Sequence, residues 1–348
     1  MKKVLVAMSG GVDSSVACLN LKREGIYCEG VTANFCCKEE ENLEYVKRAK
    51  KVCEKINIKH RVLNLTKEFE KEVILKFIEK YKKGKTPNPC IMCNKNFKFG
   101  MLLNFAKSLN FTHLATGHYA KIKYSNERNR WLLKKSKNIE KDQSYFLYFL
   151  TQEQLASVIF PLEDLEKEIV RNIAKENSLA SAETKESQDI CFVGRKSYGE
   201  FIKNIAPDAC LPGKFVDVNG KVLGEHKGIV NYTIGQRKGI GLSFKNPMFV
   251  QKINHETNEI VLTKEEELFE TELYAKNINL VLFNSLEKKI SCKAKVRYRQ
   301  KESEAFVEQL DEDLIKVSFK TPQRAIAKGQ AVVLYDYEDN VIGGGEIC

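Results

Sequence analysis

The chain has 348 residues, of which 43% are hydrophobic and 30% are charged, and its formal net charge at pH 7 is +11. This length predicts two or three domains, each with its own core. No apolar run approaches the roughly 20 residues of a membrane-spanning helix, which excludes membrane insertion. The positive charge favours a polyanionic partner such as nucleic acid, although a lysine-rich surface without a partner would carry the same charge.

The cysteines number 11, and no secretory signal precedes them. An odd number of scattered cysteines argues against a structural disulfide framework and favours a reducing, cytoplasmic environment. In such an environment thiols remain available for chemistry.

The first half of the chain alternates short apolar runs with helical stretches, which is typical of parallel strands joined by helices. The predicted elements are strands at Lys3–Met8, Gly30–Phe35, Arg61–Leu65 and His113–Thr116, and helices at Ser14–Glu24, Glu68–Lys82 and Asn96–Leu109. They predict an α/β catalytic domain with a doubly wound parallel sheet, which we expect to span residues 1–206.

From about Pro207 the sequence consists of short β-branched or aromatic runs broken by turns. Asn219-Gly220 favours a tight hairpin, because both residues tolerate a positive φ. Later strands are predicted at Ile278–Phe283, Ile290–Arg299, Ala305–Gln309, Leu314–Phe319 and Ala331–Tyr335. These runs predict a central β-rich domain over 207–275 and a C-terminal β-barrel over 276–348.

Basic residues occupy every second position in one of these predicted strands. They are Lys293, Lys295, Arg297, Arg299 and Lys301. A strand would project them from one face at intervals of about 6.6 Å. The result would be a basic stripe suited to a phosphate backbone, with ordinary solvated surface charge as the alternative.

The loop Ser9-Gly10-Gly11-Val12-Asp13-Ser14-Ser15 joins the first predicted strand to the first predicted helix. Its glycines let the backbone approach a ligand, and the N–H groups and dipole at the start of the helix favour an anion. The loop lacks the ending of a Walker loop and the spacing of a dinucleotide fingerprint. We therefore predict a different kind of phosphate site, with a glycine turn and an ordinary helix cap as the alternative.

A second motif, Thr86-Pro87-Asn88-Pro89-Cys90-Ile91-Met92-Cys93-Asn94-Lys95, sets a proline turn directly before a helix. Cys93 would lie near the helix N-terminus and beside Lys95, which should lower its pKa and raise its thiolate fraction. A small core residue, or a redox or metal pair, is the alternative. A zinc site would need a second ligand pair, and the 5 histidines show no such spacing.

Six motifs follow one another along essentially the whole chain: SGGVDSS, TPNPCIMCNKNFKFG, ATGHYA, KDQSYFL, ESQDICF and YTIGQRKGIG. The first resembles the PP-loop of ATP pyrophosphatases, which transfer AMP to a carbonyl oxygen. Together the motifs resemble the tRNA-specific 2-thiouridylases. The resemblance implies a PP-loop catalytic domain, a small central β domain and a C-terminal barrel. It also implies ATP-dependent 2-thiolation of the wobble uridine in the tRNAs for Lys, Glu and Gln.

The resemblance further implies the residues of the site. The nucleophilic cysteine corresponds to Cys93, and the cysteine that carries the persulfide corresponds to Cys191. The ATP site corresponds to Ala7, Met8, Ser9, Gly10, Gly11, Val12, Asp13, Ser14, Ala33 and Gly117. The region facing the target base corresponds to Asn88, Pro89 and Cys90. Contacts to tRNA correspond to His118, Lys141, Asp142, Gln143, Arg297, Tyr298 and Gln330.

The implied cofactor is ATP with Mg²⁺, and the implied partners are tRNA and a persulfide donor, either a cysteine desulfurase or a sulfur relay protein. Cys90 stands where well-known members of the family have an aspartate. A second hypothesis is therefore that Cys90, Cys93 and Cys191 hold a [4Fe–4S] cluster, as in related RNA thiolation enzymes. Two other functions also fit parts of the sequence: a PP-loop ligase acting on a small substrate, and an RNA-binding module without catalysis.

Overall fold

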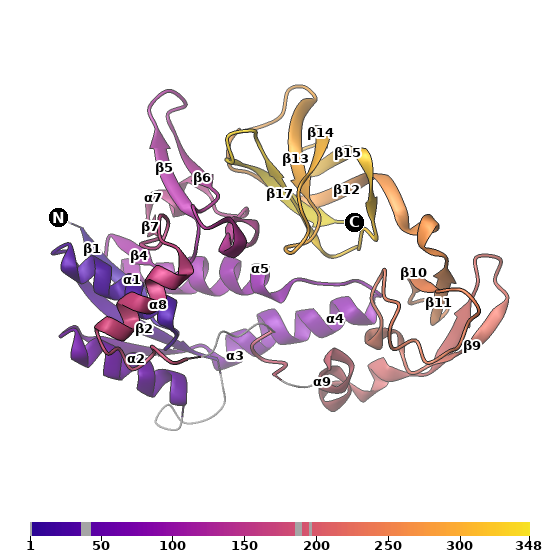
Figure 1. Cartoon of the computed structure of the whole chain (residues 1–348), viewed down its shortest axis with the longest axis horizontal. Helices are drawn as coiled ribbons and strands as arrows, with labels where there is room; N and C mark the ends of the chain where they lie inside the picture. Colours follow the sequence, from indigo (N-terminus) through magenta and orange to yellow (C-terminus); the bar gives the residue numbers. More distant parts are fainter. Residues whose placement is uncertain (1, 36–42, 185–189, 195–196) are drawn as a thin grey trace.

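The computed structural model describes residues 2–35, 43–184, 190–194 and 197–348. Figure 1 shows an α/β body around the N-terminus, a β-barrel at the C-terminus, and a smaller β body at the far end of the molecule. Long helical segments, labelled α4 and α5, run from the α/β body toward the smaller β body. In the described residues, none of the helices is both long and apolar enough to cross a membrane.

The α/β body contains a 5-stranded sheet in the order β3-β2-β1-β4-β7. All of its pairings are parallel. The strands are β1 (Lys3–Ala7), β2 (Tyr27–Asn34), β3 (His60–Asn64), β4 (His113–Ala115) and β7 (Val158–Ile159). The four strands expected from the apolar runs are confirmed, and β7 is an additional edge strand.

Helices cover both faces of this sheet. Val4 and Val6 of β1 belong to one core, with residues of α1 (Val12–Arg23), α2 (Glu44–Lys55) and α8 (Lys167–Glu176). Leu5 points the other way, into a core that includes Leu102 and Leu103. Adjacent strand residues face opposite sides of a sheet, so this division confirms the doubly wound fold.

Two long helical segments contain π-helical turns. The first consists of α3 (Thr66–Phe69), η2 (Glu70–Leu75) and α4 (Lys76–Lys82), and the second of α5 (Pro89–Cys93), η3 (Asn94–Leu102) and α6 (Leu103–Ser108). Apolar periodicity predicted both helices but not their winding. The remaining helices and the hairpin of this half are α7 (Gln152–Ala156), α9 (Tyr198–Ile205), β5 (Lys121–Ser125) and β6 (Arg130–Lys134).

The smaller β body is a 4-stranded sheet in the order β10-β11-β8-β9. Its strands are β8 (Gly213–Val216), β9 (Val222–His226), β10 (Phe249–Asn254) and β11 (Glu259–Thr263). The predicted turn at Asn219-Gly220 joins β8 to β9, but only Gly220 has a positive φ, 82°. The Gly220 N–H donates to the Asp217 carbonyl instead, in a wider loop, so the tight-hairpin prediction was wrong in its turn type.

The C-terminal part is a closed barrel in the order β12-β15-β14-β13-β16-β17. Its strands are β12 (Phe269–Leu280), β13 (Ile290–Lys295), β14 (Ser303–Asp311), β15 (Leu314–Arg324), β16 (Ala331–Tyr335) and β17 (Val341–Ile347). The predicted barrel is confirmed. The division into 1–206, 207–275 and 276–348 stays a prediction, and β12 runs through the second of its boundaries.

The predicted basic stripe does not continue beyond Lys295, where β13 ends. Arg297 lies in the turn that follows and is half-buried, whereas Arg299 and Lys301 are exposed. The prediction of five basic side chains on one strand face was therefore wrong, because alternation of residue types does not by itself reveal where a strand stops.

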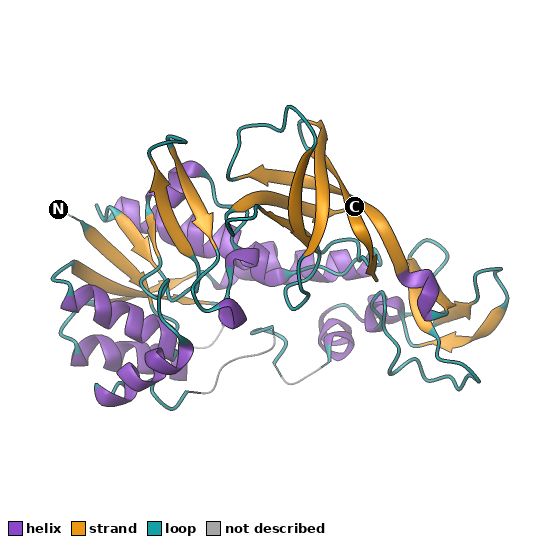
Figure 2. Ribbon diagram, turned by 45° about the horizontal axis from the view of Figure 1, so that its top comes forward, coloured by secondary structure: helices purple, strands orange, loops and turns teal. Residues whose placement is uncertain are grey.

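The barrel and the α/β body share a hydrophobic core that includes Tyr145 and Tyr148 on one side and Val333 and Val341 on the other. The Tyr145 hydroxyl donates to the Ala331 carbonyl over 2.9 Å. Figure 2 shows the barrel beside the β5–β6 hairpin, where Lys134 and Asn340 form an isolated antiparallel bridge. The barrel is thus packed directly against the part of the chain that carries the predicted catalytic loops.

Candidate active site

The glycine loop lies at the carboxyl end of β1, beside the carboxyl end of β4. β1 pairs with β2 on one side and with β4 on the other, so the direction in which successive strands are added to the sheet reverses between β1 and β4. Ligands of open α/β sheets bind in the crevice at such a switch point. The sequence-predicted ATP residues therefore lie at the position where open α/β sheets generally bind ligands, and their binding of ATP stays a prediction.

Glycine is required at two of these positions for steric reasons. Gly10 has φ 71°, and a Cβ there would lie 2.3 Å from the Tyr45 carbonyl oxygen. A Cβ on Gly117, which follows β4, would lie 2.7 Å from the Ser14 nitrogen. Gly117 therefore packs directly against the first turn of α1, bringing two predicted ATP segments together.

Hydroxyl groups shape the loop from inside. The Ser14 Oγ accepts from the Ser9 N–H over 3.2 Å and donates to the Gly11 carbonyl over 3.1 Å. The Ser15 Oγ also donates to Gly11, over 2.8 Å. Gly11 is the N-cap of α1 and provides no side-chain cap. The start of α1 is consequently open to an anion.

The remaining predicted ATP residues frame the loop. Ala7 ends β1, the Met8 N–H donates to the Val31 carbonyl over 2.8 Å, and Ala33 lies near the end of β2. Val12 is buried under the loop at the start of α1. Ala7 and Ala33 are small and half-buried, so they leave space along the edge of the sheet.

Asp13 has partners from two other segments. Lys167 of α8 donates to both of its carboxylate oxygens over 2.7 Å, and the Tyr119 hydroxyl donates to one of them over 2.8 Å. Sequence reasoning missed Lys167, which stands in an ordinary amphipathic helix without a motif. Lys167 therefore provides a counter-charge for the carboxylate of the loop.

The predicted base region is a helix start. The Asn88 side chain accepts from the N–H groups of Cys90 and Ile91 over 3.2 and 3.4 Å and caps α5, while Pro89 occupies the first helical turn. Cys90 is exposed and Cys93 is half-buried. This cap fixes the start of α5, so that Cys90 lies in its first turn and Cys93 lies at its last residue, about one turn later.

Cys191 reaches the same region through its neighbour Phe192. The Phe192 ring packs on Phe69, with ring centroids 5.8 Å apart, and on Phe77, at 5.4 Å. Phe192 and Cys93 are both packed on the small core formed by Leu65, Phe69, Val73 and Phe97. A negative charge on Cys191 raises the pKa of both Cys90 and Cys93. We call Cys90, Cys93 and Cys191 the thiol cluster.

The prediction that Cys93 has a lowered pKa was wrong for the chain by itself. Desolvation raises the pKa of Cys93 to about 12, and it raises the pKa values of Cys90 and Cys191 as well. Cys93 lies at the end of α5, a helical turn after its start, and the cation that lowers its pKa is Lys98 rather than Lys95. Desolvation outweighs both influences.

The thiol cluster does not fit an iron–sulfur cluster in this arrangement. Within the described ranges, which include all three thiols, no three His, Cys, Asp or Glu side chains are close enough together to hold a metal ion. Residues 186–189 of the motif ESQDICF lie outside the described residues.

The predicted tRNA contacts after β4 are engaged within the protein. The buried His118 lies between Thr116 Oγ1, 2.7 Å from its Nδ1, and Lys98 Nζ, 3.4 Å from its Nε2. Asp142 is buried and accepts from the Ser136 N–H over 3.0 Å, and Gln143 Oε1 accepts from the Tyr119 N–H over 3.0 Å. Lys141 precedes them in the same turn, with its side chain half-buried.

The predicted tRNA contacts of the barrel also have internal partners. Arg297 donates to the Ile234 and Ala325 carbonyls over 3.1 and 2.8 Å, and the Tyr298 ring packs on Phe146 with centroids 4.4 Å apart. Gln330 Nε2 donates over 2.8 Å to the carbonyl of Thr86, two residues before Asn88. These side chains therefore also position the segments around the site.

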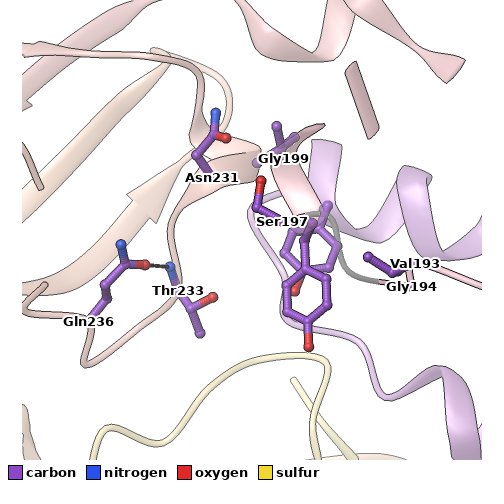
Figure 3. A pocket seen from close by; sticks show the side chains of 10 residues that line it. Val193, Gly194, Ser197, Gly199, Asn231, Thr233 and Gln236 are labelled. Carbon is purple, nitrogen blue, oxygen red and sulfur yellow. Dashed lines mark hydrogen bonds between the residues drawn. The ribbon is translucent and has the colours of Figure 1, made fainter. Parts of the chain in front are cut away.

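A cavity of about 390 Å³ lies behind the loop that carries Cys191. Figure 3 shows Val193, Gly194 and Ser197 on one side of it and Asn231, Thr233 and Gln236 on the other. Thr233 and Gln236 belong to the motif YTIGQRKGIG, which Asn231 directly precedes and to which sequence reasoning gave no position in the site. The motif thus borders the segment of Cys191, and Gln236 Oε1 accepts from the Thr233 N–H over 3.0 Å to hold its turn.

Family models match nearly the whole chain. Residues 2–195 match the tRNA methyl transferase HUP domain, 199–264 the tRNA methyl transferase PRC-barrel domain, and 270–347 the aminomethyltransferase beta-barrel domain. A solved 4-thiouridine synthetase in complex with RNA and ATP is more remote. It has 20% identity and a TM-score of 0.39, covering 60% of this chain and 51% of that one.

Named relatives match over the same length. The tRNA-specific 2-thiouridylase MnmA of Clostridium beijerinckii is 47% identical over 99% of this chain and 98% of its own. The protein of the same name from Clostridioides difficile is 46% identical over 99% of this chain and 98% of its own. The chain therefore belongs to the family of tRNA-specific 2-thiouridylases, MnmA.

Proposed function

We propose that this protein uses ATP to replace the 2-oxygen of the wobble uridine of tRNA with sulfur, in the tRNAs for Lys, Glu and Gln. The partners we propose are tRNA and a cytoplasmic persulfide donor, either a cysteine desulfurase or a sulfur relay protein. One observation carries the proposal. The segment Thr116–His118 contacts both parts of the site. Its Gly117 contacts the nucleotide loop, and its His118 contacts Lys98, which lies beside the thiol cluster. Activation and sulfur transfer can therefore occur on one base.

The first step we propose is adenylation. The 2-oxygen of uridine is a poor leaving group. Its attack on the α-phosphate of ATP forms the bond to AMP and releases pyrophosphate, which gives a much better leaving group. In this step the amide groups at the start of α1, the hydroxyls of Ser9 and Ser14, and the close approach at Gly117 hold the phosphates. Their contribution is positioning and electrostatic stabilisation. The chain's Asp13 stabilises the loop through Lys167 and is not assigned to a metal.

The second step is sulfur transfer. The terminal sulfur of a persulfide on Cys191 attacks C2 of the activated base, and AMP leaves with the former 2-oxygen. The Cys93 thiolate attacks the Cys191 sulfur, and the bond between that sulfur and the transferred one breaks. The products are 2-thiouridine, AMP and a Cys93–Cys191 disulfide, which an external thiol reductant then opens. The base has to leave its stack to reach these groups.

The positive charge of the chain supports a tRNA substrate. A net charge of +11 favours a polyanion through release of its counterions. Exposed basic residues near the barrel turn, such as Arg299 and Lys301, lie beside the segment of Arg297 that contacts the smaller β body. We place part of the tRNA footprint there.

The test is an incubation of the full chain with ATP, unmodified tRNA and a persulfide donor. The expected result is tRNA-dependent AMP together with 2-thiouridine in the hydrolysed tRNA, both measured by mass spectrometry. AMP release without tRNA would instead indicate a ligase for a small substrate. Binding of tRNA with neither product would indicate an RNA-binding module, and either outcome would refute the proposal.

A further inference from the structure

Lys98 contacts the site through His118, although it is not among the predicted site residues. It is half-buried, whereas Lys95 on the same segment is exposed. Lys98 lies in η3, the π-helix whose N-cap is Cys93. In a π-helix residue i bonds to residue i+5, so residues five apart lie on roughly the same side of the helix. Lys98 follows Cys93 by five positions, and the π winding places the two on one face.

A second element holds the Lys98 ammonium group from the other side. His118 Nε2 lies 3.4 Å from Lys98 Nζ, and His118 Nδ1 lies 2.7 Å from Thr116 Oγ1. An ammonium group only donates hydrogen bonds, so His118 Nε2 is the acceptor from Lys98. The Nδ1–H group of His118 then donates a hydrogen bond to Thr116 Oγ1. The His118 ring is itself fixed between Phe99 and Phe160, with centroids 5.6 and 5.8 Å apart.

Lys98 acts electrostatically on all of the clustered thiols. Its charge lowers the pKa of Cys90, of Cys93 and of Cys191, against the desolvation that raises each of them. It also lowers the pKa of His118, which burial already holds well below 6.5. In the described part of the chain, the groups whose pKa values respond to Lys98 therefore include the three thiols and the His118 imidazole.

We propose that Lys98 is a positioning residue whose ammonium group stabilises anionic sulfur in the thiol cluster, and that His118 holds it there. A persulfide on the exposed Cys191 and the attacking thiolate on the half-buried Cys93 are both anionic, and a nearby cation stabilises them. Lys98 supplies this cation, and its link through His118 and Thr116 extends to Gly117 at the nucleotide loop. The inference rests on the proposed function only in assigning this anionic sulfur to sulfur transfer onto tRNA.

The test measures thiol reactivity in the full chain without ATP or tRNA. Each cysteine is alkylated with iodoacetamide between pH 7 and 9, and the rate at each is quantified by peptide mass spectrometry. An opposite charge within a few ångströms lowers a thiol pKa by about 1–3 units. Thiolate fraction changes tenfold per unit, but nucleophilicity partly compensates. Lys98→Met should therefore slow alkylation of Cys93 by roughly three- to thirtyfold.

Two further variants separate charge from packing. In Lys98→Arg, the rate of Cys93 alkylation should stay within about twofold of that in the parent chain, because arginine keeps the positive charge. Lys95→Met removes an exposed lysine from the same helical segment and should change nothing. Cys210, whose pKa responds to Lys203 and Asp208 instead, serves as the internal control in every sample.

Unchanged alkylation of the thiol cluster in Lys98→Met would overturn the inference. So would an equal loss in Lys95→Met, or a loss in Lys98→Arg as large as in Lys98→Met. Thermal unfolding is measured first, and Lys98→Gln replaces Lys98→Met if the latter is unfolded. Because no tRNA is present, the inference can hold even if tRNA thiolation fails, and the reverse is equally visible.

Discussion

The variant Gly11→Ala separates an effect on ligand binding from an effect on the stability of the protein. Gly11 has φ −93°, which alanine adopts without strain, and an added Cβ would meet only the Ser9 Oγ, at 3.3 Å. Alanine is a weaker N-cap than glycine, so the expected loss of stability is about 0.5–1 kcal/mol. In a domain of this size that lowers Tm by roughly 1–4 °C.

The same methyl group faces the phosphates that we propose to bind at the start of α1. A displacement of about 1 Å at a reacting centre costs on the order of a hundredfold in rate. Tm is measured by calorimetry, and adenylation as tRNA-dependent AMP release. Gly11→Ala should therefore remain folded and lose about a hundredfold in AMP release.

Gly117→Ala is the contrasting variant. Its Cβ would lie 2.7 Å from backbone atoms of Asp13 and Ser14, which cannot rotate away as a hydroxyl can. We expect a loss of about 1–3 kcal/mol in stability as well as in activity. Near-normal AMP release by Gly11→Ala would remove the loop from the proposed mechanism, whatever Gly117→Ala does.

Three other predictions concern the cysteines, pH and RNA binding. Cys93→Ser and Cys191→Ser should abolish thiolation while Cys90→Ser retains part of it, and anaerobically purified protein should be colourless. Stoichiometric iron that is lost in Cys90→Ser would instead establish the [4Fe–4S] cluster. Burial holds the pKa of His118 well below its ordinary 6.5, so below that pH the unfolded chain binds more protons than the folded one. The free energy of unfolding should therefore decrease as the pH is lowered below 6.5. If the His118→Gln variant loses as much stability as the parent chain over this range, this prediction is refuted. Arg299→Gln should weaken tRNA binding and reduce the slope of log K against log salt by about 1, and an unchanged slope would place the RNA elsewhere.

Local sequence patterns predicted the parts of the fold that depend on local physics. Apolar runs identified β1 to β4, because strands buried on both faces have few polar positions. β12 was expected to begin at Ile278 but begins at Phe269, because its first residues, rich in glutamate, are exposed at the edge of the smaller β body and show no apolar run. The winding of η3 has no signature in residue spacing.

The site divided in the same way. The loop Ser9–Ser15 is contiguous, and its chemistry could be inferred from one stretch of sequence. Cys191 approaches Cys93 because Phe192 packs on Phe69 and Phe77, a contact between distant segments that no spacing reveals. Lys98 stands inside a recognised motif, yet its position follows only from the π-helical turn.

The contact between Thr86 and the barrel has a consequence for the order in which this protein matures. The Thr86 N–H donates to the Lys328 carbonyl over 2.8 Å, and its carbonyl accepts from Gln330 over 2.8 Å. Gly329, with φ 89°, lets the barrel turn approach this closely. A nascent chain emerging from the ribosome carries the nucleotide loop and all members of the thiol cluster long before these partners are synthesised. The segment leading to Asn88 can therefore make these contacts only after the end of the barrel has been synthesised.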